Sequence, residues 1–77
     1  MKTIDEAFAE QQLALDRAVA ASLALQQFRS LHTAGEWTPE IGGALQPLLR
    51  ELTTAAESLG YKSRVALLYN ERKLGLR

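Results

Sequence analysis

A run of residues without glycine or proline, from Thr3 to Thr33, most constrains how this chain can fold. The run consists mainly of Ala, Leu, Gln and Glu, which are good helix formers. Thr3 and Glu6 match the capping box that opens a helix, and Gly35 suits the left-handed residue that follows a helix end. The sequence therefore predicts one long helix over residues 4–33.

A second helix is predicted over residues 39–59. Thr38 is a good N-cap, and Pro39 suits the first helical position. Apolar residues then recur on one face of a helical wheel, with polar residues opposite. Pro47 removes one backbone hydrogen bond, so a kink or a loose first turn is expected there, and Gly60 is expected to end the helix.

The last segment predicts a short helix over residues 64–74, with Ser63 as its cap. Apolar residues alternate from Val65 to Tyr69, which also permits a strand, but no other strand is predicted that could pair with it. The predicted fold is all-α: an antiparallel helical hairpin with a short C-terminal helix, forming one small domain over residues 1–77.

The first predicted helix is long for so small a chain. About 30 helical residues span about 45 Å, whereas a compact chain of this size is roughly 30 Å across. The helix is therefore expected to bend or to project. One apolar stripe is expected to meet the second helix: Ile4, Ala7, Phe8, Leu15, Ala18, Val19, Ser22 and Leu25.

Further apolar residues lie nearly opposite that stripe, and residues 18–25 carry no charge on any side. A helix that is apolar all round is expected to be buried all round. The second stripe either holds the third helix or is covered by a second copy or another protein. The expected protein interface consists of Leu13, Ala20, Leu23, Ala24, Phe28, Leu31 and Trp37. Trp37 is expected either to plug the end of the hairpin or to be an exposed contact anchor.

The zero net charge hides an asymmetry along the chain. Residues 1–60 hold four basic and eight acidic residues, whereas residues 61–77 hold five basic and one acidic residue. A basic end of this kind can meet phosphate or an acidic protein surface, or it can complement the acidic helices of its own fold. The basic patch consists of Lys62, Arg64, Arg72, Lys73 and Arg77.

Four short groups of residues lie near the end of the chain: Ala55-Ala56, Leu59-Gly60, Leu68-Tyr69 and Leu74-Gly75-Leu76. With these groups, residues 55–76 resemble in part the helix-turn-helix that ends bacterial enhancer-binding regulators. The gap between the second and third groups is two residues longer than in that motif, so the chain is not assigned to that family. The resemblance implies DNA binding, which is the alternative function.

The composition predicts no enzymatic site. One histidine and no cysteine give neither a Cys/His nucleophile pair nor a histidine-rich metal site, so no catalytic residue, cofactor or metal is expected. No apolar run reaches the ~18 residues of a membrane span, and no secretory signal is recognised, so a cytoplasmic protein is expected. The predicted function is a small non-enzymatic protein–protein interaction module, such as an adaptor, a chaperone-like partner or an inhibitor, acting as a homodimer or on another protein.

Overall fold

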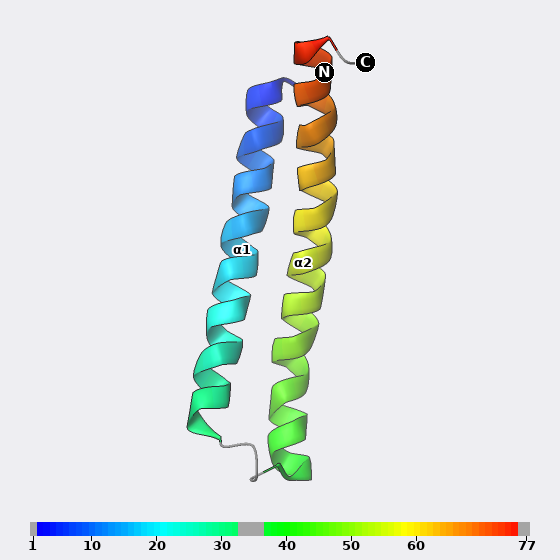
Figure 1. The fold of residues 1–77 in the computed structure, drawn as a ribbon. Helices are drawn as coiled ribbons and strands as arrows, with labels where there is room; N and C mark the ends of the chain where they lie inside the picture. Colours follow the sequence, from blue (N-terminus) through cyan, green and yellow to red (C-terminus); the bar gives the residue numbers. More distant parts are fainter. Residues whose placement is uncertain (1, 33–36, 76–77) are drawn as a thin grey trace.

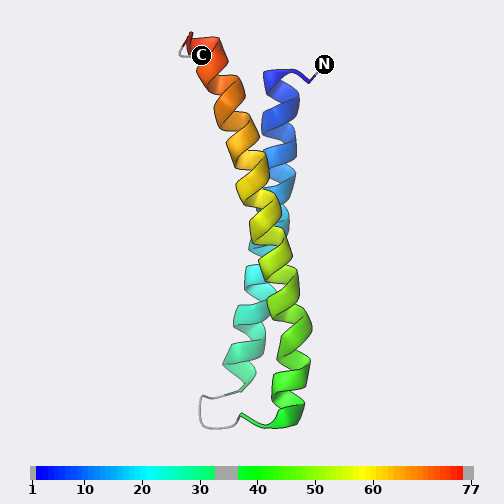
Figure 2. The same cartoon turned by 90° about the vertical axis from the view of Figure 1, so that its right-hand side faces the viewer.

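The structure, a computed structural model, describes residues 2–32 and 37–75. These residues form two helices and no strand: α1 (Ile4–Leu31) and α2 (Pro39–Leu74). The helices run antiparallel and side by side, and both views show the same long rod (Figures 1 and 2). The rod measures 54 × 19 × 16 Å. The all-α helical hairpin predicted from the sequence is confirmed.

The start of α1 follows the predicted capping box. The hydroxyl of Thr3 accepts a hydrogen bond from the backbone N–H of Glu6 at 3.2 Å. Asp5 and Glu6 place negative charge in the first turn, where the helix dipole is positive. Local sequence signals therefore determine where α1 begins.

The end of α1 lies at Leu31, and His32 is the C-cap in an extended conformation. The N–H of His32 donates to the carbonyl of Arg29 at 3.3 Å. The predicted continuation to Thr33 and the left-handed residue expected at Gly35 lie outside the described residues.

The main correction concerns α2, which continues through Gly60 for 36 residues. The expected end at Gly60 and the separate helix over residues 64–74 were therefore wrong. An exposed glycine costs a helix only about 1 kcal/mol, and the half-buried positions continue beyond it in the same spacing. Helix α2 ends at Gly75, whose φ of 78° provides the left-handed cap.

The continuity of α2 also bears on the resemblance to a helix-turn-helix. Residues 60–63 are helical, so the turn that this motif requires is not formed there. The helix likewise runs on through Pro47, which lies on its exposed side.

The length of α2 explains why α1 neither bends nor projects. Helix α1 has 28 residues and α2 has 36, so the second helix spans the full length of the first. The expectation that the first helix bends or projects was wrong, because the whole molecule is a rod with a radius of gyration of 17.1 Å. A compact chain of this length would have about 11–12 Å.

We expect the Gly60→Ala variant to be more stable than the natural sequence by about 0.5–1 kcal/mol. Alanine has a better helix propensity, and a methyl group at this position would meet no atom within 4 Å. Urea unfolding followed by circular dichroism measures this difference. A loss of stability would contradict the continuous helix, because it would mean that Gly60 occupies a turn.

Candidate protein-interaction surfaces

The two helices meet through alanines. Three of them recur at every seventh position of α1, the heptad spacing of a helix that packs along one partner. Methyl groups at the contact let two helix axes approach closely. We call this row of buried residues the alanine seam; it consists of Ala7, Ala14 and Ala21 of α1 and Ala55 and Ala66 of α2.

The large apolar side chains lie outside the alanine seam. Within residues 2–32 and 37–75, all of the buried residues are alanine, and no large side chain is fully buried. Leu13 is 69% exposed and Leu31 is 77% exposed. The most buried positions therefore hold small residues, whereas the large apolar residues that usually fill a core are half-buried or exposed. The exposed large apolar residues are Phe8, Leu13, Leu15, Val19, Leu23, Leu31, Trp37, Leu49, Tyr61, Leu67 and Leu74.

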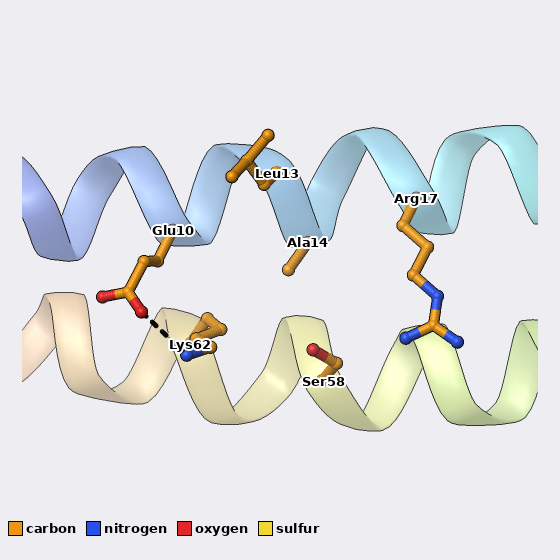
Figure 3. A pocket seen from close by; sticks show the side chains of 6 residues that line it. All are labelled: Glu10, Leu13, Ala14, Arg17, Ser58 and Lys62. Atoms are coloured by element: carbon orange, nitrogen blue, oxygen red, sulfur yellow. Dashed lines mark hydrogen bonds and ion pairs between the residues drawn. The ribbon is translucent and has the colours of Figure 1, made fainter.

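One side of the rod is crossed by ion pairs, and we call it the ion-pair face. The Nζ of Lys62 donates to the carboxylate of Glu10 at 3.1 Å. Arg17 binds both carboxylate oxygens of Glu51, at 2.7 and 3.2 Å. Figure 3 shows Glu10 and Arg17 reaching from α1 toward α2 on either side of Ala14.

The charges on this face shift each other's pKa values. The ammonium group of Lys2, followed by that of Lys62, lowers the pKa of the Glu10 carboxyl below its ordinary value. Glu10 in turn raises the pKa of Lys2. Arg17 lowers the pKa of Glu51 through its hydrogen bond. These groups stay charged at neutral pH, so any partner of the ion-pair face meets fixed charges.

The other side of the rod carries apolar residues from both helices, and we call it the apolar face. Phe8 of α1 and Leu67 of α2 line one open groove. Leu49 lies 18 residues before Leu67, which is five helical turns, so it belongs to the same side. The apolar face consists of Phe8, Leu15 and Val19 of α1 with Leu49, Ala56 and Leu67 of α2.

The groove in the apolar face contains neutral polar groups only. Its volume is about 300 Å³, and its floor includes Ala66 of the alanine seam. The side-chain amide of Gln11 donates to the hydroxyl of Ser63 at 3.3 Å, across the two helices. The remaining polar side chain in the groove is Asn70, so no charge lines it.

The structure corrects the expected contact stripe of α1. Phe8, Leu15 and Val19, which were expected to meet the second helix, are exposed on the apolar face. Positions Ala14 and Ala21 are buried in their place. The helical wheel of α1 was centred on its large apolar side chains, whereas the residues of α1 that are fully buried in the structure are small.

The predicted interface residues of α1 are divided between surfaces. Leu13 lines a hollow beside Glu10 and Arg17 on the ion-pair face, and Leu31 follows it by five turns on the same side. Ala20 is exposed seven residues after Leu13, and Ala24 is half-buried. These four residues form a stripe on α1, which we call the outer stripe: Leu13, Ala20, Ala24 and Leu31.

The other two predicted residues of α1 lie elsewhere. Phe28 follows Ala21 by seven residues, is half-buried beside the alanine seam, and packs its ring against His32 at 4.6 Å between ring centroids. Leu23 is exposed and lies one turn beyond Val19 of the apolar face.

Trp37 is 65% exposed, and part of its ring lies against the first turn of α2. A methyl group added to Gly42 would lie 2.5 Å from the Cζ2 atom of this ring. A side chain at this position would therefore displace the ring. Of the two placements predicted from the sequence, the exposed one is found.

The basic patch of α2 lies beside the acidic start of α1. Lys62 is paired with Glu10, and the guanidinium of Arg72 lies 5.5 Å from the ring centroid of Tyr69. Residues 2–10 and 62–75 together hold five basic and four acidic side chains, so this end of the rod is almost neutral. Arg64 and Lys73 are exposed, and Arg77 lies outside the described residues.

Comparisons of the chain with protein-family models, with curated proteins and with solved structures found no match. In the described part of the chain, no group of three or more His, Cys, Asp or Glu side chains is placed to hold a metal ion. Neither α1 nor α2 is long and apolar enough, over its described residues, to cross a membrane.

We expect Ala14→Leu to destabilise the hairpin by about 1–3 kcal/mol, because a larger side chain in the alanine seam forces the helices apart. The matched control is Ala9→Leu, which makes the same change at an exposed position of the same helix and should alter stability by less than about 0.5 kcal/mol. Thermal unfolding of both variants tests this. Equal losses of stability in the two variants would contradict the role of the alanine seam as the contact between the helices.

We expect Gly42→Ala to displace the ring of Trp37 and to shift its fluorescence emission to longer wavelength. Trp37 is the single tryptophan of the chain, so the signal belongs to it alone. The control is Gly43→Ala, because a methyl group at Gly43 meets no atom within 4 Å. An unchanged spectrum for Gly42→Ala would show that the ring does not rest on this turn.

Proposed function

We propose that the protein is a non-enzymatic interaction module that packs its exposed apolar side chains against helices of another polypeptide. The observation that carries this proposal is that only alanines are fully buried in the described residues, whereas eleven large apolar side chains are exposed. Two helices alone leave their large apolar side chains half-buried or exposed, so a further layer of protein is needed to cover them.

The free energy available from such a layer is large for this chain. Full burial of one Leu or Phe side chain is worth about 1.5–3 kcal/mol. A small domain has a total stability of only about 5 kcal/mol. Covering even three or four of the exposed side chains would therefore contribute as much as the hairpin itself.

The outer stripe provides a surface for a partner helix. Leu13 and Leu31 stand five turns apart, and Ala20 and Ala24 lie between them. Small residues between two large ones let a partner helix lie close along α1, in the manner of a helix in a groove. An adaptor, a chaperone-like partner and an inhibitor would all use such a surface. The chain has no cysteine and so needs no oxidising compartment, and we place this activity in the cytoplasm.

The alternative function, transcriptional regulation through DNA binding by the basic patch, has less support. DNA binding relies on basic groups that neutralise phosphates. Here Lys62 is already paired with Glu10, and the end of the rod that carries the patch is almost neutral. The interaction module is therefore the function that the arrangement favours.

The proposal is tested with a photocrosslinking amino acid placed at Leu31 in the native cell. We expect one discrete protein adduct, because Leu31 lies on the outer stripe. The same adduct should disappear when the chain also carries Leu13→Asp, which puts a charge into that stripe. The matched control is the crosslinker at Gln12, a polar exposed position next to Leu13.

Three outcomes would overturn the proposal: no protein adduct above the Gln12 control, an adduct unaffected by Leu13→Asp, or an adduct with nucleic acid. The last outcome would favour the DNA-binding alternative.

A further inference from the structure

We infer that the apolar face binds a second copy of this chain, so that two hairpins form a four-helix bundle and the ion-pair faces remain outside. This inference rests on the proposed function and names the partner of one of its surfaces. The two sides of the rod differ in charge, and charge decides which side can pack against its own copy.

A symmetric dimer places the same patch against itself, so every charge in the patch meets its own copy. The ion-pair face carries Glu10, Arg17, Glu51 and Lys62, and its burial would remove these charges from water at a high cost. The groove of the apolar face is lined by apolar and neutral polar side chains only. This groove can therefore meet a second copy without burying charge.

The size of the rod favours a partner of the same size. One whole side of a rod 54 Å long and 16 Å across projects only about 860 Å², and a stable protein interface needs about 800 Å² from each partner, so a stable complex has to cover nearly the full side. The face spans both helices, since Phe8 and Leu67 share one groove. A single partner helix would cover only part of it, whereas a second hairpin covers its full width.

The middle of the apolar face offers a large residue beside a small one. Ala14, which precedes Leu15 in the sequence, lines the same hollow as Ser58 of α2 on the ion-pair face (Figure 3). Leu15 therefore lies near the level of Ser58 along the rod. Ala56 lies close to that level and is exposed, seven residues after Leu49. A second copy related by a twofold axis at this level can place its Leu15 on Ala56 of the first. Such alternation of large and small side chains lets facing helices interlock.

The first test uses single cysteines, because the chain has none of its own. Leu15→Cys should form a covalent dimer with a short bismaleimide, which can span the width of the bundle core. The two residues 15 lie against each other if the hairpins run antiparallel and diagonally across the bundle if they run parallel, so the reagent joins them in either case. The matched control is Leu13→Cys, on the same helix but the opposite face. Residue 13 is 69% exposed and residue 15 is 36% exposed, so random collision would favour the control.

We expect Leu15→Cys to cross-link at least about a hundredfold faster than Leu13→Cys, because an interface holds the paired thiols at a high effective concentration. Equal rates, or faster cross-linking of Leu13→Cys, would overturn the inference.

The second test is sedimentation of the full chain at micromolar concentration. The natural sequence and Leu13→Asp should be dimers, whereas Leu15→Asp should be a monomer. Leu67→Asp, on the other helix of the apolar face, should also be a monomer, so the result does not depend on the folding of one variant. A monomeric natural sequence, or a dimer that survives both Leu15→Asp and Leu67→Asp, would overturn the inference. Either result would leave the proposed function standing if the Leu31 photocrosslink to another protein is found.

Discussion

The close contact of two helices through alanine methyl groups determines the rest of this structure. Because Ala14 and Ala21 of α1 are buried at the closest contact of the helices, the leucines and aromatic rings of the described residues lie beside that contact, half-buried or exposed. The exposed apolar surface is thus a direct consequence of how the hairpin holds itself together.

Ion pairs then make the two sides unequal. The antiparallel arrangement brings the acidic start of α1 beside the basic end of α2, and Glu10 and Lys62 pair across the helices on the ion-pair face. Exposed ion pairs contribute little to stability, but they fix charges on the surface they cross. The groove of the apolar face has an uncharged lining, in which the amide of Gln11 donates to the hydroxyl of Ser63. The charge asymmetry along the sequence therefore becomes an asymmetry between two faces.

Local signals were sufficient to predict where the helices begin, but not where α2 ends or which residues meet. Thr3 and Thr38 cap the two helices as their side chains predict. Gly60 was misjudged because helix propensity is a weak local preference, and the long packing of α2 against α1 overrides it. Phe8, Leu15 and Val19 were wrongly placed in the contact stripe because large side chains dominate a helical wheel. The heptad spacing of Ala7, Ala14 and Ala21 was the available signal.

The missing core links folding to binding in this chain. A ligand that binds only the folded state adds its binding free energy to the stability of that state. Here the side chains available for binding are the ones that a larger domain would use for its own core, so covering Leu15 or Leu67 stabilises the hairpin as well as the complex. In the proposed complex, loss of the partner would therefore weaken the fold, and a weakened alanine seam would weaken the surface offered to the partner. Association in that complex would complete the burial that the hairpin alone leaves unfinished.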